Sequence, residues 1–240
     1  MSLEIIIPIY NEEAILEVSA KLVANYCQAN FDDWQLTLII NGSSDNSLTI
    51  AENLATNFPQ ITIINLHLGG KGYALKHGLI NSSADILLYM DIDLAVSLEA
   101  TTKLVDLINQ GHAIAIGSRL LPNSQTDRSK LRDYSSKIYN HLASFILGAK
   151  ISDWQCGFKA MSRDTAQKLI PLIQDDRWFF DTELLSLANH FNLSISELPI
   201  DWSENRYAQR QSKIRLTRDP FIFLVNLFKL KKRLKNLKNS

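Results

Sequence analysis

The chain has 240 residues, of which 46% are hydrophobic and 21% charged, enough for one globular domain with a sizeable core. Its 25 basic and 25 acidic residues balance, which argues against a nucleic-acid-binding protein held by bulk charge. Two cysteines, Cys27 and Cys156, exclude a disulfide framework and a thiolate zinc cluster. They are typical of a reducing compartment, so we expect a soluble cytoplasmic protein.

Charge is distributed unevenly along the chain. Residues 1–205 carry 14 Lys/Arg and 24 Asp/Glu, a net charge of −10, whereas residues 206–240 carry 11 Lys/Arg and a single acid, Asp219. A basic C-terminal segment on an acidic body is typical of proteins that meet phosphates or lipid head groups.

Short β-branched segments alternate with helical patterns over the first half of the chain. The expected strands are Leu3–Ile9, Gln35–Ile40, Ile61–Asn65, Ile86–Met90 and Ala113–Gly117, and the expected helices cover residues 12–29, 45–57, 71–81 and 97–109, the last with Ser97 as its cap. This order predicts an α/β fold with a mostly parallel, twisted sheet flanked by helices.

The second half is less regular. Residues 120–129 are an expected polar loop, and an amphipathic helix over 130–147 ends at Gly148. Its apolar stripe consists of Leu131, Tyr134, Ile138, Leu142 and Phe145. Two shorter helices (163–173 and 181–191) and a strand near 195–199 follow. Because polar loops follow the strands, we expect a ligand site at the carboxyl edge of the sheet.

Polar segments follow the first two expected strands. Pro8-Ile9-Tyr10-Asn11-Glu12-Glu13 places a helix start beside a strand end, an arrangement that binds nucleotides and other anions, and Tyr10 can pack on a base. Helix capping by Asn11 explains the same residues equally well. Asn41-Gly42-Ser43-Ser44-Asp45, taken alone, is explained as a turn followed by a cap.

Asp91 and Asp93 follow the fourth expected strand. In an extended segment, residues i and i+2 point the same way, so both carboxylates can face one cation. Two acids at the end of an apolar strand are costly unless something positive pairs with them. The segment therefore predicts a site for Mg²⁺ or Mn²⁺, which also bind phosphate oxygens.

The glycine-rich segment 69–74 contains Lys71 at a helix start, where it can reach a diphosphate. The segment lacks the GxxxxGK[ST] spacing of a P-loop and the GxGxxG of a dinucleotide-binding enzyme. The five histidines have no paired metal spacing, and no GxSxG segment supports a serine nucleophile.

Six segments in this order resemble family 2 glycosyltransferases, most closely the dolichyl- or polyprenyl-phosphate glucosyl- and mannosyltransferases. They are PIYNEE (8–13), GKGYALKHG (70–78), MDIDL (90–94), GSRLL (117–121), DWQCGFKA (153–160) and FFDTELL (179–185). The resemblance runs from Ile5 to about Lys213. It implies a single nucleotide-sugar-binding domain over residues 1–218.

The resemblance also implies roles for residues at matching positions. Pro8, Tyr10, Glu12 and Lys71 would bind the nucleotide-sugar; Asp91, Asp93 and Gln155 would hold the metal; Arg119 and Arg132 would bind phosphate on the donor or the acceptor. Relatives usually have an acidic pair where this chain has Ile40-Asn41. The amide oxygen of Asn41 is expected to replace the second acid in binding the base. A catalytically weakened nucleotide-sugar-binding protein is the alternative that this substitution leaves open.

The residues favour direct inverting transfer to a phosphate. A metal stabilises the charge that builds on the leaving β-phosphate. A phosphate monoester has a second pKa of about 6, so at pH 7 it is already an anionic nucleophile. It therefore needs cations to place it. Those cations would come from Arg119, Arg128, Lys130, Arg132 and the basic residues from Arg206 to Arg218, Lys213 among them. A hydroxyl acceptor would need a base, for which Asp181 and Glu183 are the candidates.

Residues 219–240 predict a basic amphipathic helix that begins with the cap Asp219-Pro220. Its apolar stripe consists of Phe223, Leu227, Leu230, Leu234 and Leu237, and lysines and an arginine surround it. Such helices lie in membrane interfaces and favour anionic lipid. Docking on its own domain and a coiled-coil dimer seam fit the same pattern.

Together these features predict a metal-dependent glycosyltransferase, peripheral on the cytoplasmic face of a membrane. It would move a hexose from UDP-glucose or GDP-mannose to a polyprenyl phosphate. Transfer to a lipid or saccharide hydroxyl is the alternative. The sequence leaves the nucleotide base, the sugar and the oligomeric state open, and a homodimer is among the alternatives.

Overall fold

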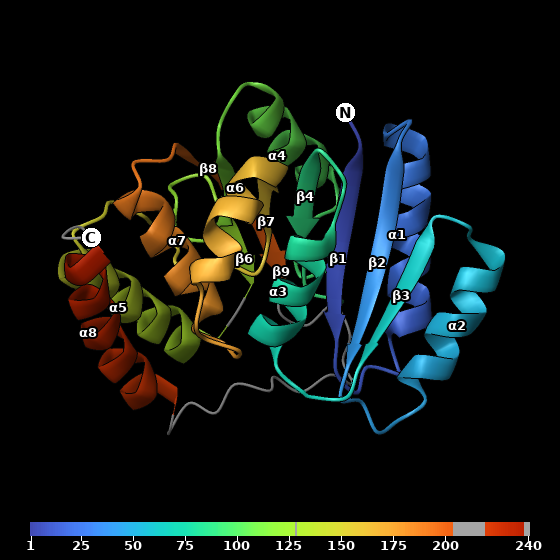
Figure 1. Cartoon of the computed structure of the whole chain (residues 1–240), viewed down its shortest axis with the longest axis horizontal. Helices are drawn as coiled ribbons and strands as arrows, with labels where there is room; N and C mark the ends of the chain where they lie inside the picture. Colours follow the sequence, from blue (N-terminus) through green and yellow to red (C-terminus); the bar gives the residue numbers. More distant parts are fainter. Residues whose placement is uncertain (128, 204–218, 238–240) are drawn as a thin grey trace.

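One sheet organises the computed structural model, which describes residues 1–127, 129–203 and 219–237. The sheet has the strand order β3-β2-β1-β4-β7-β5-β8. Its strands are β1 (Leu3–Ile9), β2 (Trp34–Asn41), β3 (Ile61–Leu66), β4 (Ile86–Tyr89), β5 (Ile114–Ser118), β7 (Lys159–Ser162) and β8 (Ile195–Pro199). β7 pairs antiparallel with β4 and β5, and the other pairs are parallel (Figure 1). The expected mostly parallel sheet flanked by helices is confirmed.

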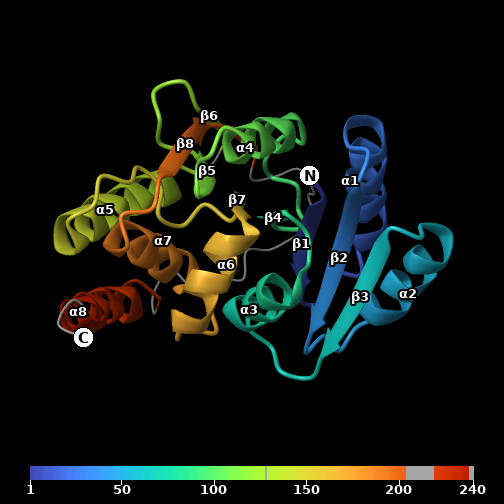
Figure 2. The ribbon, with the colours of Figure 1, turned by 45° about the horizontal axis from the view of Figure 1, so that its top comes forward.

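Helices cover both faces of the sheet (Figures 1 and 2). One face carries α1 (Leu16–Asn30), α2 (Ser47–Asn57) and α4 (Glu99–Asn109), and the other carries α3 (Lys71–Asn81), α6 (Arg163–Leu169) with the 3-10 turn η1 (Ile170–Leu172), and α7 (Phe180–His190). Beyond α7 lie α5 (Lys130–Leu147) and α8 (Asp219–Leu237). A short parallel ribbon pairs β6 (Gln125–Asp127) with β9 (Asp201–Ser203).

The continuous apolar runs of the central strands fill two cores. Ile5 and Ile7 of β1 pack into the core under α1 and α4, whereas Ile6 between them packs into the core under α3 and α7. Tyr89 of β4 belongs to the second core and Leu88 to the first. Since successive side chains of a strand point to opposite faces, a sheet covered on both sides needs apolar residues at every position.

Several boundaries differ from the sequence expectation. α1 begins at Leu16, because the carbonyl of Glu12 first closes a turn by accepting from Ile15 and Leu16. Ser97 does not cap α4, since its hydroxyl is bonded to the carboxylate of Glu99 and the helix has no side-chain cap. The expected loop 120–129 contains β6. The four-residue β7 was not expected, because its flanking motif carries no strand-like alternation.

α5 lies where the sequence predicts, from Lys130 to Leu147, and ends at Gly148 with φ 71°. Four of the five residues of its expected apolar stripe are nevertheless exposed: Leu131 (68%), Tyr134 (67%), Ile138 (50%) and Phe145 (80%). The helix packs on the domain through the side that carries Asn140, Ala143 and Ile146 instead. The stripe is therefore a surface feature of the described structure and not a core contact.

α8 docks on its own domain. Phe223, Leu227 and Leu230 of its apolar stripe are buried against α5 and α7, and Leu234 and Leu237 pack partly buried beside them. Arg233 forms an ion pair with Glu183 of α7. The stripe that suggests membrane insertion is thus covered by protein, which is one of the alternatives that the sequence left open. No helix among the described residues is long and apolar enough to cross a bilayer.

The docking of α8 makes two neighbouring substitutions differ in their effect on stability. Leu227 is fully buried and Phe228 is 58% exposed. Leu227→Ala should therefore lower the free energy of unfolding by about 2–5 kcal/mol, whereas Phe228→Ala should change it by about 0.5 kcal/mol or less. Urea unfolding of the full chain measures both values. Equal effects would mean that α8 does not pack on the domain in solution.

Candidate active site

A cavity of about 410 Å³ opens at the carboxyl ends of β1, β2 and β4. All six residues that the sequence assigns to nucleotide-sugar binding line it: Pro8, Tyr10, Glu12, Asn41, Lys71 and Asp91. Gly42, His67, Gly69, Gly70, Ile92, Arg177 and Trp178 complete the lining. The topology thus gathers residues from five separate segments of the chain at one site.

Hydrogen bonds between two loops fix the wall that carries Tyr10 and Glu12. Asn11, with φ 51°, accepts at its side-chain oxygen from the backbone N–H of Ser44 (2.8 Å). The N–H groups of Asn11 and Glu12 donate to the hydroxyls of Ser43 (3.1 Å) and Ser47 (3.0 Å). Asparagine tolerates the left-handed conformation better than most residues, which suits it to this position. Tyr10 stays 45% exposed on the cavity wall.

Asn41 joins the first wall to the glycine-rich segment. Its amide nitrogen donates to the carbonyl of Ile9 (2.8 Å), and its amide oxygen accepts from the N–H of Gly70 (3.0 Å). The side chain is buried, so both ends of the amide serve the protein backbone. An aspartate here would accept from Gly70 but would have nothing to donate to Ile9. These two hydrogen bonds therefore explain why asparagine, and not aspartate, stands at position 41.

The glycines before α3 seat a neighbouring loop. A Cβ atom would lie 2.4 Å from the carbonyl oxygen of Asp176 if placed on Gly70, and 2.6 Å from that of Asp175 if placed on Gly72. The N–H of Gly72 donates to the carbonyl of Arg177 (3.1 Å). Backbone carbonyls thus take the place that a phosphate has in a P-loop, in agreement with the missing P-loop spacing.

Below the cavity, four charged side chains alternate in sign. Lys71 Nζ lies 2.8 Å from Asp91 Oδ1 and 3.9 Å from Asp181 Oδ2. Asp181 Oδ1 lies 2.5 Å from Lys159 Nζ and accepts from the hydroxyl of Tyr89 (2.6 Å). β4, α3, β7 and α7 each contribute to this cluster, so it joins the middle of the sheet to the helices above it.

Burial and charge oppose each other in this cluster. Burial by itself would raise the pKa of Asp181, but the neighbouring Lys159 and Lys71 ammonium groups hold that pKa below its usual range. Burial would likewise lower the pKa of Lys71, yet Asp91 and Asp181 keep it above the ordinary value. Burial raises the pKa of Tyr89 well above its ordinary value. At neutral pH Asp181 is thus a carboxylate, Lys71 an ammonium group and Tyr89 a neutral phenol.

Two of the three residues proposed for the metal, Asp91 and Asp93, lie together and fit a small, hard cation. Asp91 and Asp93 line one hollow together with Gly157. A Cβ atom on Gly157 would lie 2.5 Å from Asp91 Oδ2 and 2.7 Å from Lys71 Nζ, so glycine leaves this side of the carboxylate open. Among the described residues no group of three His, Cys, Asp or Glu could hold a metal. A cation here would therefore depend on two carboxylates and on oxygens of the substrate, a donor set that suits Mg²⁺ or Mn²⁺. Gln155 lines neither this hollow nor the cavity.

Arg119 is held away from the cavity lining. Its Nε and Nη2 donate to the two oxygens of Asp153 at 2.7 and 2.8 Å, and its guanidinium lies 4.9 Å from the ring centroid of Trp202. Two of its five N–H groups are used in this pair, which leaves others for a ligand. Arg132 lies in the first turn of α5. Arg206 and Lys213, also predicted to bind the acceptor phosphate, lie outside the described residues.

Neither candidate base lines the cavity. Asp181 is engaged by Lys159 and Tyr89 as described above. Glu183 accepts from the backbone N–H groups of Gln174 (3.0 Å) and Asp175 (2.9 Å) and pairs with Arg233. Its carboxylate therefore holds the loop that carries Arg177 and Trp178.

Three residues of the cavity lining were not predicted from the sequence: His67, Arg177 and Trp178. Trp178 lies with its ring centroid 5.8 Å from Lys71 Nζ. Arg177 and Trp178 directly precede the segment FFDTELL, so extending that motif by two residues would have found them. His67 follows β3 at the same sheet edge as Asn41, a position that the βαβ pattern also indicates.

The family model described as glycosyl transferase family 2 matches residues 4–170, and the chain belongs to this family. Glycosyltransferase AglD of Haloferax volcanii is 30% identical over 225 residues, which cover 91% of this chain and 35% of AglD. Dolichyl-phosphate beta-glucosyltransferase ALG5C of Trichomonas vaginalis is 30% identical over 213 residues, 83% of this chain and 63% of that protein. The chain thus spans from about a third to under two thirds of these relatives. The human dolichyl-phosphate beta-glucosyltransferase is 29% identical, with 84% and 67% covered.

A solved structure shares the fold. Glucosyl-3-phosphoglycerate synthase from Mycobacterium tuberculosis, crystallised with UDP, superposes with a TM-score of 0.69 at 19% identity, covering 96% of this chain and 80% of that one. The same enzyme has been solved with Mn²⁺, UDP-glucose and phosphoglyceric acid. At this identity the similarity establishes the fold and nothing more.

The charge cluster predicts an acid-dependent stability. The pKa of Asp181 is lower in the folded chain than in the unfolded chain. Its ion pairs therefore stabilise the fold at pH values above about 4, the usual carboxyl pKa, and this stabilisation is lost as the pH falls through the pKa of the folded state. Asp181→Asn leaves the buried Lys159 without its partner and should lower the free energy of unfolding at pH 7 by about 3–5 kcal/mol. The difference from the unmodified chain should shrink as pH falls from 5 to 2. Urea unfolding across this range measures it.

Glu17→Gln is the matched control, because Glu17 pairs with Lys21 on the exposed surface of α1 at 2.6 Å. It should change the free energy of unfolding by about 0.5 kcal/mol or less. A pH-independent effect of Asp181→Asn would contradict a depressed pKa for Asp181.

Proposed function

We propose that this chain is an inverting glycosyltransferase that moves glucose from UDP-glucose to a membrane polyprenyl phosphate. The observation that carries the proposal is the cavity that Tyr10, Glu12, Lys71 and Asp91 line at the carboxyl edge of the sheet. Family membership supports the reaction class. The dolichyl-phosphate beta-glucosyltransferases among its relatives support the sugar and the lipid phosphate, and GDP-mannose is the second donor that fits.

The donor would lie with its base at the Pro8–Glu12 wall and its diphosphate toward Lys71. Tyr10 has the exposure that stacking on a base needs. The ammonium of Lys71, held charged by Asp91 and Asp181, would neutralise diphosphate oxygens. Trp178, beside Lys71, offers an aromatic face to the sugar.

A divalent cation, Mg²⁺ or Mn²⁺, would be held by Asp91, Asp93 and Gln155 and would supply Lewis-acid stabilisation of the leaving diphosphate. Lys71 sits at Asp91 Oδ1, and the opening beside Gly157 leaves Oδ2 accessible. The chain's own contribution is then to orient Asp91 through Lys71.

The engagement of both candidate bases favours a phosphate acceptor over a hydroxyl. Asp181 is bound by Lys159 and Tyr89, and Glu183 by two backbone N–H groups and Arg233, so neither is available to take a proton from an acceptor hydroxyl. A phosphate dianion needs no base. Arg119 and Arg132 would help to place this phosphate. The protein would then act as a peripheral protein on the cytoplasmic face of the membrane, where the lipid-borne acceptor lies.

Donor binding is tested by thermal unfolding with UDP- and GDP-linked sugars, each with Mn²⁺ and with EDTA. A ligand at a hundredfold excess over its Kd stabilises by about 2.7 kcal/mol, or roughly 5–10 °C for a chain of this size. We expect this shift with UDP-glucose and Mn²⁺, its loss with EDTA, and its loss in Asp91→Asn.

Asp106→Asn on the exposed side of α4 is the control and should keep the full shift. No shift with any donor would overturn the proposal and favour a protein that has lost nucleotide-sugar binding. A shift with GDP-mannose alone would change the donor and leave the reaction class standing.

The acceptor is tested by the pH dependence of transfer to a short, water-soluble prenyl phosphate. Because the dianion is the nucleophile, kcat/KM should rise tenfold per pH unit up to about pH 6, the second pKa of a phosphate monoester, and level off above it. The corresponding prenyl alcohol should accept nothing. Transfer to the alcohol, or a product that retains the anomeric configuration of the donor by NMR, would contradict the proposed reaction.

A further inference from the structure

The exposed apolar stripe of α5 is a surface feature that the site does not explain. Leu131, Tyr134, Ile138 and Phe145 are each at least half exposed. At 100° per residue they fall within a sector of roughly 60° on one side of the helix. Soluble proteins rarely expose contiguous patches of this kind without a partner.

α5 is firmly attached through its other side, so the stripe is not a consequence of loose packing. Asn140 accepts from the N–H of Trp154 (2.7 Å), and Ser144 accepts from the indole N–H of the same tryptophan (2.9 Å). Tyr139 lies 2.7 Å from the hydroxyl of Thr182. These contacts fix the direction in which the stripe points.

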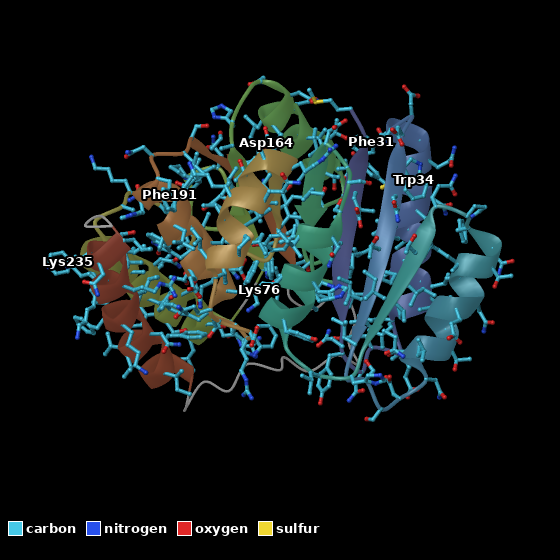
Figure 3. All side chains as sticks on the ribbon, in the orientation of Figure 1. Phe31, Trp34, Lys76, Asp164, Phe191 and Lys235 are labelled. Carbon is cyan, nitrogen blue, oxygen red and sulfur yellow. The ribbon has the colours of Figure 1, made fainter. Side chains whose placement is uncertain are left out.

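α8 lies along α5 and adds positive charge beside the stripe. The rings of Tyr139 and Phe223 are 5.6 Å apart, and both figures of the ribbon place the two helices side by side. The exposed side of α8 carries Phe228 and four lysines: Lys229, Lys231, Lys232 and Lys235. Lys235 projects away from the sheet in Figure 3. Residues 222–237 contain no acid.

We propose that the α5 stripe and the exposed lysines of α8, together the α5–α8 face, bind the surface of an anionic membrane. The side chains of the stripe would enter the lipid interface, and the lysines would contact head groups. This assigns the apolar contact to α5, whereas the sequence pattern suggested the stripe of α8, which the domain covers.

The charge of the α5–α8 face favours a lipid surface over a second copy of this chain. A symmetric dimer through this face would bring the four lysines of one α8 toward those of the other, with no acid of α8 between them. A bilayer with anionic lipid complements both the lysines and the apolar side chains.

The inference deepens the proposed function and rests on it in one respect, which is that the membrane would deliver the acceptor. The start of α8 and the carboxyl ends of β1 to β3 lie at the same edge of the molecule (Figure 1). A bilayer against α5 and α8 would then lie beside the edge where the cavity opens.

Flotation of the full chain with vesicles tests the α5–α8 face. The vesicles are phosphatidylcholine alone or mixed with phosphatidylglycerol, at low salt. We expect binding to the mixed vesicles, and at least a tenfold weaker partition for the double variant Ile138→Ser/Phe145→Ser. Lys231→Gln/Lys235→Gln should weaken binding on the order of 30-fold, at about 1 kcal/mol per lysine near an anionic surface.

Val18→Ser/Leu22→Ser is the matched control, because these residues are exposed on α1 at 55% and 47%, at the opposite end of the sheet. It should float like the unmodified chain. Equal binding by the α5 double variant overturns the proposal. So does a dimer in sedimentation without lipid that Ile138→Ser/Phe145→Ser converts to monomer.

Transfer to the water-soluble prenyl phosphate separates this inference from the proposed function. The α5 double variant should keep that activity and lose transfer to a long-chain acceptor embedded in vesicles. Vesicle binding without any transfer by the unmodified chain would leave the membrane face standing and refute the enzyme. Transfer to the soluble acceptor without vesicle binding would refute the membrane face and leave the proposed enzyme standing.

Discussion

The carboxylate of Asp181 is the constraint around which the site is built. It lies buried between Lys159, which would be an unpaired buried cation without it, and Lys71, which it approaches to 3.9 Å. Lys71 in turn holds Asp91 at the end of β4. One buried acid thus links Lys159 in the middle of the sheet to the Lys71–Asp91 pair that lines the cavity. Sheet and helices meet at this point.

A second set of contacts joins the cavity to the outer helices. Gly70 and Gly72 let the carbonyls of residues 175–177 approach the start of α3, and Glu183 holds the same loop from the α7 side. Arg233 of α8 pairs with Glu183. The wall with Arg177 and Trp178 is thereby fixed to the α7–α8 interface.

Strand periodicity is a local signal, and it predicted the sheet and most helices. Strand-end polarity, together with the resemblance to family 2 glycosyltransferases, predicted six residues of the cavity lining. The sequence did not predict β7, whose four residues pair in the middle of the sheet only because β4 and β5 are already there. Nor did periodicity say which side of α5 faces the core. Ala143 and Ile146 pack against the domain there, while the residues of the predicted stripe other than Leu142 remain exposed. The role of Asn41 depended on Gly70, 29 residues further along the chain, which spacing alone does not reveal.

The position of Glu183 also bears on how mutagenesis of such enzymes is interpreted. An acid in this motif whose replacement abolishes turnover is readily assigned as a proton acceptor. Here the carboxylate binds two main-chain amides and an arginine from the last helix, so its removal would release the loop and the helix together. Inactivity of a Glu183 variant would thus indicate that the loop with Arg177 and Trp178 has lost its position. It would carry no information about proton transfer.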